Sequence, residues 1–380
     1  MIYLDNSATT QPYREVIEAY QKAAFTYFGN PSSLHGLGLE AEKILTLTRE
    51  QIARLVFAKP NEIIYTSGGT EGNNLAIKGT AFQLRGRGNH LVTSAVEHPS
   101  SLEAFTELEN LGFHVTYVKP NERGLITADM IEAALTEQTT LVSILHVNNE
   151  TGTVQPIEEI GKRLRHYKKI RFHIDHVQGA TKVPISFQDG YYDLATFSAH
   201  KFHGLKGMGF LYKKEGVLIT PLFHGGGQEQ NVRGGTEHVA GAVSMAKALR
   251  LSIEQFEHKK TQLMNLRNKL MDELETIKGV ILNTDRDHSA PHIVNFSVPG
   301  MKPEVLIQAL SAKEIYVSTK SACSSKKTEP SHVLLGMGME KARAESAIRV
   351  SLSFQNTKEE VEMLVKELHK QIPKLLEVLR

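Results

Sequence analysis

The feature that most constrains the fold is the alternation of short apolar runs and helical segments between residues 60 and 215. Seven runs rich in Val, Ile, Tyr, Phe and Thr are predicted as strands: EIIYTS (62–67), HLVTSAV (90–96), FHVTYV (113–118), TLVSILHV (140–147), RFHID (171–175), DLATFS (193–198) and GFLYK (209–213). Most of these runs do not alternate strictly between apolar and polar residues, which is typical of a sheet covered on both faces. Helical patterns such as TEGNNLAIKGTAF and SSLEAFTELENLG separate them. The alternation predicts an α/β fold with a mainly parallel seven-stranded sheet.

A second, smaller unit is indicated after Thr236, where the pattern changes. Residues 238–278 form one long helical pattern, which is closed by Gly279. PHIVNFSVP and AIRVSLS are predicted as strands and KPEVLIQALSAKE as a helix, and a capping box of Thr357 and Glu360 begins a last helix. A chain of 380 residues is long enough for about two domains, so we expect a smaller α+β domain here.

Charge and cysteine content narrow the classes of function. The net charge of +2 does not indicate a nucleic-acid-binding surface. The single cysteine cannot form an internal disulfide, which indicates a reducing compartment. The sequence has no run of about 18 apolar residues and no charged segment followed by an apolar one at its start, so neither a membrane span nor a signal peptide is predicted. We therefore expect a cytoplasmic protein without direct contact to membrane or nucleic acid.

Small and polar residues follow several strands, where an open parallel sheet binds its ligands. Gly69 follows the first strand and Thr70 begins a helix, and the free N–H groups of such a helix bind anions such as phosphate. A plain glycine turn ahead of a helix is the simpler explanation of the same residues when they are taken alone. His98 follows HLVTSAV, and Asn149 follows TLVSILHV in a turn-forming sequence. Each of these signals is weak alone.

A carboxylate and a lysine follow two later strands. Asp175 ends the strand RFHID, and a carboxylate buried there needs a cationic or hydrogen-bonding partner. His173, Asp175 and His176 suggest a metal site, but His176 would point away in strand geometry and no second cluster supplies further ligands, so we expect no metal. Lys201 follows DLATFS and is either a surface lysine or a partly buried amine nucleophile. Thr236 lies in a glycine-rich segment that is either a flexible loop or a further anion site.

Taken together, these residues suit pyridoxal 5′-phosphate. Its aldehyde needs a lysine, its ring nitrogen needs a carboxylate, and its phosphate needs small donors at a helix N-terminus. The order of the motifs closely resembles the cysteine desulfurases of the NifS/IscS family, class-V aminotransferases with the type I pyridoxal-phosphate fold of aspartate aminotransferase. The resemblance runs from YLDNSATT near residue 3 to about residue 355 and includes TSGGTEGNN, EHPS, HVNNETG, HIDHVQ, SAHKFHGLKG, RGGTE, SACSS and RVSLS.

The resemblance implies a role for each residue at the cofactor. Lys201 would hold the cofactor covalently, Asp175 would pair with its ring nitrogen, and Gln178 would bond its phenolic oxygen. The predicted cofactor-binding set is Gly69, Thr70, His98, Asn149, Asp175, Gln178, Ser198, His200, Lys201 and Thr236. Thr236 would reach the phosphate from the neighbouring subunit, so the resemblance implies a homodimer. It also implies that residues 1–12 pack with the small domain, giving a large domain over 13–258 and a small domain of 1–12 and 259–380.

The resemblance also implies the reaction. Asn149 and Arg349 would orient L-cysteine, His98 would move protons, and the sulfur would pass to Cys323 as a persulfide while L-alanine leaves. Cys323 lies in STKSACSSKK, a polar segment in which a nearby lysine favours the thiolate. An acceptor protein would then take the sulfur for iron–sulfur cluster assembly or for tRNA or cofactor thiolation. Two alternatives stay open: another pyridoxal-phosphate aminotransferase or lyase in which Cys323 is incidental, and a non-catalytic sulfur-relay protein.

Overall fold

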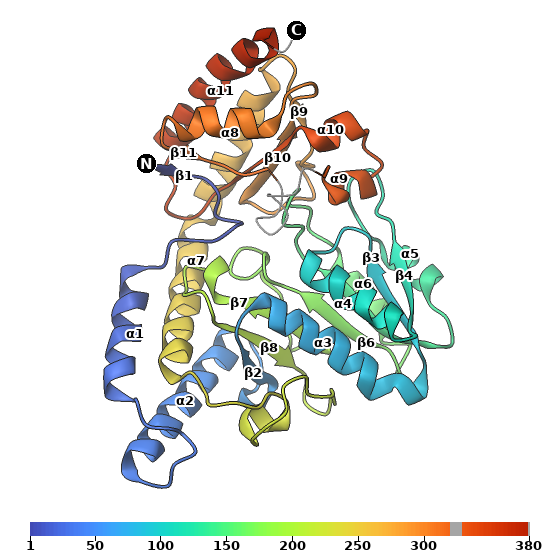
Figure 1. Cartoon of the computed structure of the whole chain (residues 1–380), viewed down its shortest axis with the longest axis vertical. Helices are drawn as coiled ribbons and strands as arrows, with labels where there is room; N and C mark the ends of the chain where they lie inside the picture. The colour runs from blue at the N-terminus through green and yellow to red at the C-terminus, as the bar shows by residue number, and fades with distance from the viewer. Residues whose placement is uncertain (320–328, 379–380) are drawn as a thin grey trace.

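The central element of the structure, a computed structural model that describes residues 1–319 and 329–378, is one large twisted sheet. Within the described residues, seven strands form it in the order β2-β8-β7-β6-β5-β3-β4 (Figure 1). They are β2 (Ile63–Thr66), β3 (His90–Ser94), β4 (His114–Val118), β5 (Thr139–Leu145), β6 (Arg171–Asp175), β7 (Leu194–Ser198) and β8 (Gly209–Lys213). Only β8 runs antiparallel to its neighbours. The predicted fold class and all seven predicted strands are confirmed.

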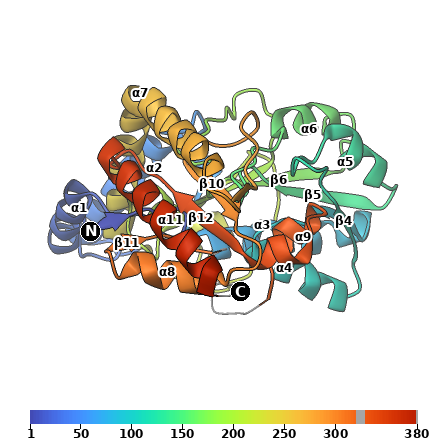
Figure 2. The ribbon, with the colours of Figure 1, turned by 90° about the horizontal axis from the view of Figure 1, so that it is seen from above.

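Helices cover both faces of this sheet, as the non-alternating strands predict. On one face lie α3 (Gly69–Leu84) and α4 (Pro99–Asn110), which bury a core with Leu91 and Leu141 of the sheet. The other face is covered by α2 (Gly36–Leu55), α5 (Ala128–Ala134), α6 (Ile157–Leu164) and the first half of α7 (Val239–Glu275), and α1 (Arg14–Thr26) packs outside α7. Figure 2 shows α3 and α4 on one side of the sheet and α5 and α6 on the other. Short 3₁₀ helices are η1 (Pro60–Glu62), η2 (Arg85–Arg87), η3 (Ala199–Lys201) and η4 (Gln228–Asn231).

A second core lies above the first in Figure 1. It is built on the antiparallel strands β9 (Ile281–Leu282), β10 (Ile293–Ser297) and β12 (Ala347–Ser351), with α8 (Pro303–Ser311) and α11 (Lys358–Val378) packed against them. The short helices α9 (His332–Gly336) and α10 (Lys341–Glu345) form a separate small cluster with Val96 and Leu145. At its edge β1 (Ile2–Tyr3) pairs in parallel with β11 (Ile315–Tyr316), so the first residues do pack beside the C-terminal half.

One helix joins the two cores. Along α7, buried residues as far as Leu249 belong to the core of the large sheet, and those from Leu263 onward belong to the second core. The boundary between domains predicted at residues 258 and 259 falls within this helix and stays a prediction. The capping box at the start of α11 is confirmed, because the Thr357 amide donates to Glu360 Oε2 at 3.1 Å and the Glu360 amide donates to Thr357 Oγ1 at 3.3 Å.

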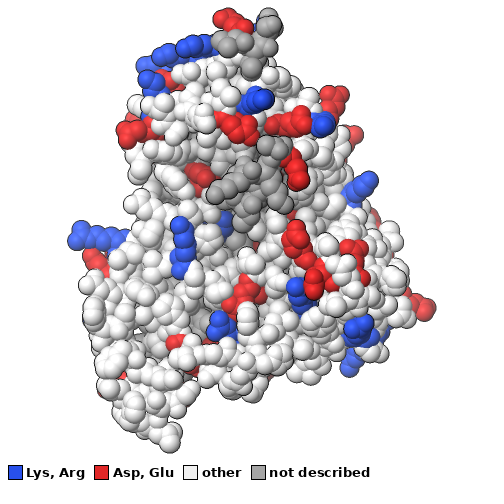
Figure 3. Space-filling view, in the orientation of Figure 1, with Lys and Arg blue, Asp and Glu red and all other residues white. Residues whose placement is uncertain are grey.

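The surface carries both signs of charge. On the face shown in Figure 3, acidic and basic side chains of the described residues are interspersed. No helix within residues 1–319 and 329–378 combines the length and the apolar character that a bilayer crossing requires.

Candidate functional site

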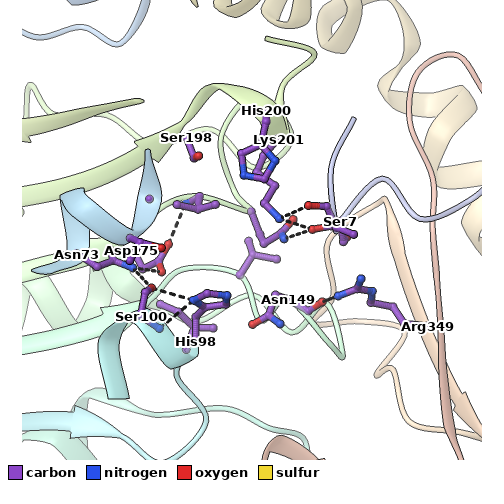
Figure 4. A pocket seen from close by; sticks show the side chains of 17 residues that line it. Ser7, Asn73, His98, Ser100, Asn149, Asp175, Ser198, His200, Lys201 and Arg349 are labelled. Carbon is purple, nitrogen blue, oxygen red and sulfur yellow. Dashed lines mark hydrogen bonds between the residues drawn. The ribbon is translucent and has the colours of Figure 1, made fainter. Parts of the chain in front are cut away.

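A pocket opens at the carboxyl ends of β5, β6 and β7, between the two cores. It is closed by the N-terminal segment on one side and by β12 on another (Figure 4). Ten predicted site residues line it: Gly69, Thr70, His98, Asn149, Asp175, Gln178, Ser198, His200, Lys201 and Arg349. The sheet topology explains the convergence, because the ends of neighbouring parallel strands meet at one edge.

Lys201 lies in η3, directly after β7. Its Nζ donates to the carbonyl oxygens of Ser7 at 2.5 Å and Ala8 at 2.9 Å. The N-terminal segment is tied to the same turn, since the Thr10 amide donates to the His200 carbonyl at 2.9 Å. The amine is therefore held in the pocket by residues nearly 200 positions away in the chain.

Asp175 ends β6 and is only 6% exposed. Its Oδ2 accepts a hydrogen bond from Asn73 Nδ2 at 2.7 Å, and its Oδ1 accepts one from the Val177 amide at 3.0 Å. Burial raises the pKa of this carboxyl, while those two hydrogen bonds and the charge of Lys201 act in the opposite direction. A protonated ring nitrogen placed against Asp175 would supply the cation that the buried carboxylate needs.

An anion cradle forms where α3 begins. Gly68, with φ of +143°, turns the chain from β2 into α3. A Cβ atom on Gly69 would lie 3.0 Å from Val177 Cγ2 and 3.6 Å from Ser198 Cβ, so the first turn of the helix faces the end of β7 closely. Its N–H groups, Thr70 and Ser198 are suitable donors for a phosphate.

His200 and His98 are both neutral at physiological pH. Burial, helped by the charges of Lys201 and Lys206, lowers the pKa of His200 to about 3. Burial and then the charge of Lys201 lower the pKa of His98 to about 4. His98 caps α4, where its Nδ1 accepts a hydrogen bond from the Ser100 amide at 3.1 Å, so the ring proton lies on Nε2.

Arg349 lies on β12 with only 1% of its surface exposed. Its Nη1 donates to the Asn149 carbonyl at 2.8 Å, and its Nη2 donates to Asp5 Oδ1 and Ser318 Oγ, both at 2.9 Å. Its Nε has no hydrogen-bond partner within the described residues. The guanidinium is thus fixed in orientation and keeps a donor for a further acceptor such as a carboxylate.

One further predicted site residue lies elsewhere, and another falls outside the described residues. Thr236 lines a separate hollow, together with Tyr65, Ser67 and Gly235. Cys323 lies outside the described residues. The histidines that suggested a metal have other partners: His173 bonds the hydroxyls of Ser143 and Thr196, and His176 stacks on His146. In the part of the chain that the structure describes, no group of three or more His, Cys, Asp or Glu is placed to hold a metal ion.

Sequence reasoning missed several residues of the pocket. The pocket is also lined by Ser7, Ala8, Asn73 and Ser100. Asp5 accepts a hydrogen bond from Arg349. A signal existed for Asn73, which lies three residues after Thr70 and therefore on the same face of the predicted helix. Asp5 and Ser7 lie within the motif YLDNSATT, but no local pattern assigned either of them a role in the pocket.

The residues present fit pyridoxal 5′-phosphate. The pocket combines an amine, a buried carboxylate in need of a cation, and an anion cradle at a helix N-terminus. Three buried polar atoms of pocket residues, Ser7 Oγ, Asn73 Oδ1 and Arg349 Nε, also lack a partner within the described ranges, as expected where a ligand completes the hydrogen bonding.

Comparison with known proteins agrees with this geometry. Residues 2–364 match the family model described as "Aminotransferase class-V". A protein of Dictyoglomus turgidum named "Cysteine desulfurase IscS" is 43% identical over 375 residues, which cover 98% of this chain and 95% of that protein. A "NifS/IcsS protein homolog" of Lactobacillus delbrueckii subsp. bulgaricus is 44% identical over 367 residues, or 96% of this chain and 95% of that protein.

The solved structures give the same result. One titled "NIFS-LIKE PROTEIN" superposes with a TM-score of 0.92 at 37% identity and covers 98% of this chain and 100% of that chain. Because the family model and the relatives extend over nearly the whole sequence, the chain belongs to the NifS/IscS family of class-V aminotransferases.

Proposed function

We propose that the protein is a cysteine desulfurase that releases L-alanine from L-cysteine and passes the sulfur through Cys323 to an acceptor protein. The observation that carries this proposal is the meeting of the Lys201 amine, the Asp175 carboxylate, the His98 ring and the Arg349 guanidinium in one pocket. The name of the Dictyoglomus relative supports cysteine as the substrate.

The family depends on pyridoxal 5′-phosphate. When bound, this cofactor is an electron sink that weakens bonds at the α and β carbons of an amino acid. Lys201 would hold its aldehyde carbon and Asp175 its ring nitrogen. Gln178 would bond its phenolic oxygen, and Gly69, Thr70, Ser198 and His200 would surround its phosphate.

Arg349 and Asn149 would bind and orient the substrate. Arg349 is buried, held on two sides, and keeps one donor without a protein partner in the described ranges, so a carboxylate would gain a charge-assisted hydrogen bond there. The carbonyl groups of Ser7 and Ala8 would hold the Lys201 amine while the substrate's amino group takes its place. His98 would exchange protons through Nε2, because Nδ1 is engaged by the Ser100 amide.

A homodimer is the assembly we propose. Large apolar side chains are exposed on the α1–α2 region, with Phe25 at 77%, Phe28 at 70% and Leu34 at 93%. Exposed apolar groups gathered in one region are typical of a surface that a partner covers. Thr236, which lies apart from the pocket of its own chain, would then reach the phosphate site of the second subunit.

A cytoplasmic location also belongs to this proposal and rests on the single cysteine.

The test compares Cys323→Ala with Lys201→Ala. Each variant receives isotopically labelled L-cysteine, and we measure alanine, protein-bound sulfur and the visible absorbance of the bound cofactor. We expect Cys323→Ala to keep the absorbance and lose persulfide formation, and Lys201→Ala to lose the absorbance and all turnover. If Cys323→Ala releases alanine and sulfur at the wild-type rate, the thiol is incidental and the aminotransferase or lyase alternative applies.

A further inference from the structure

A second, buried lysine contacts the backbone of Lys201. Lys182, in the segment between β6 and β7, is only 3% exposed. Its Nζ donates a hydrogen bond of 2.7 Å to the backbone carbonyl oxygen of Lys201. A buried ammonium is costly, and a neutral donor would satisfy this carbonyl at a lower cost. The charge of Lys182 therefore calls for an explanation.

The titratable groups that face Lys182 are basic. They are Lys201 of η3, His176 after β6, His203 after η3, and His292 before β10. Burial, followed by the charge of Lys201, lowers the pKa of Lys182 to about 7. Within the described residues Lys182 forms no ion pair, and its charge interacts with that of Lys201.

Another buried lysine shows the contrast. Lys213 of β8 is 9% exposed, and its Nζ donates to the Val217 carbonyl at 3.1 Å. Burial lowers its pKa as well, but the nearby carboxylates of Glu62 and Glu215 raise it in opposition. Lys213 has the surroundings of a structural lysine, whereas Lys182 faces a second cation.

We propose that Lys182 is a positioning residue for Lys201, because it holds the Lys201 peptide carbonyl in place, and that its positive charge acts on the Lys201 amine. This inference rests on the proposed role of Lys201 in holding the cofactor. An amine condenses with an aldehyde only when it is uncharged, and the reaction forms a C=N bond and releases one water. A like charge nearby favours the uncharged amine, so Lys182 would prepare Lys201 for this condensation.

The test measures how fast cofactor-free protein condenses with pyridoxal 5′-phosphate, followed by the visible absorbance of the product between pH 6 and pH 9. Lys182→Arg keeps both the donor and the charge, Lys182→Gln keeps a donor without the charge, and Lys182→Met removes both. Lys213→Met is the matched control, since it removes a buried lysine that also binds a backbone carbonyl.

We expect Lys182→Gln and Lys182→Met to condense roughly tenfold more slowly at pH 6.5, because the Lys201 amine loses the nearby like charge that favours its uncharged form. Lys182→Arg and Lys213→Met should stay close to the wild-type rate. The deficit should shrink above pH 7, where wild-type Lys182 also loses its proton. A merely structural role would not produce this dependence on pH.

The proposal is overturned if folded Lys182→Gln condenses at the wild-type rate throughout the pH range. Circular dichroism establishes folding, and if Lys182→Met does not fold, the comparison of Lys182→Gln with Lys182→Arg decides. If wild-type protein gains no visible absorbance with the cofactor, the proposed role of Lys201 fails first, which separates the two proposals.

Discussion

Replacing Glu97 with glutamine should remove a large part of the pH dependence of stability. Glu97 precedes His98 and is completely buried. Its Oε1 accepts hydrogen bonds from Ser94 Oγ at 2.5 Å and from the Leu145 amide at 3.0 Å, while its Oε2 has no partner within the described residues. Burial raises the pKa of Glu97 from 4.5 to about 8, and the nearby charge of Asp175 adds to the effect.

The sign and the size of the change in the free energy of unfolding with pH follow from this pKa. The folded protein binds the proton of Glu97 more tightly than the unfolded chain, so its contribution to stability is complete below pH 4.5 and is lost as the pH rises through about 8. Each pH unit within this window costs about 1.4 kcal/mol, and the whole window costs about 5 kcal/mol. Glutamine carries no charge, and any cost of placing its amide group is independent of pH.

The assay is urea unfolding of wild-type protein and Glu97→Gln with saturating cofactor at pH 5.5, 7 and 8.5. The free energy of unfolding of the variant, relative to wild type, should rise by about 1.4 kcal/mol per pH unit up to about pH 8 and then stay level. Glu107→Gln, at an exposed position of α4, is the control and should show a constant difference. A constant difference for Glu97→Gln as well would refute the reasoning.

Three further predictions concern the pocket and the start of strand β8. Asn73→Ala should weaken cofactor binding roughly ten- to a hundredfold in a fluorescence titration, since it removes the 2.7 Å hydrogen bond to Asp175, and unchanged affinity would count against the assigned role. Arg349→Lys should raise the KM for cysteine about tenfold or more in steady-state kinetics, because a lysine cannot keep the fixed fork geometry; an unchanged KM would place the carboxylate elsewhere. Gly209→Ala should destabilise the protein by about 1–3 kcal/mol in thermal unfolding, because the new Cβ would lie 2.5 Å from a carbonyl oxygen of β7. Gly86→Ala, with open space around it, is its control.

The large sheet was predictable because its strands carry a local signal. Each is a run of β-branched and aromatic residues that ends at a turn, as in GFLYK, and such runs are recognisable without tertiary contacts. The strands β1 and β11 have two residues each and exist only because Ile2 and Ile315 meet across the fold. Their pairing depends on distant parts of the chain, so no local pattern predicted them.

The functional site likewise contains residues that a local pattern predicts and contacts that no local pattern predicts. The rule that ligands bind beyond the carboxyl ends of parallel strands led to Asp175 and Lys201, and both line the pocket. The contacts of Lys201 with Ser7 and of Arg349 with Asp5 join segments that are far apart in sequence. Such pairs follow from the packing of the two cores and not from spacing. Cys323 lies outside the described residues, and its assigned role stays a prediction.

The position of the N-terminal segment has a consequence for how the protein is made. Residues 2–10 are made long before their partners, since Asn6 finds its hydrogen-bond partner, the Ser351 carbonyl, 345 residues later. At ordinary rates of translation this interval lasts roughly 20 to 70 seconds. In the later part of this interval, the nascent chain already contains Lys201 but still lacks β12, the strand that anchors the segment holding its amine. The pocket is therefore completed only after β12 has been made, and chains truncated before β12 cannot assemble it.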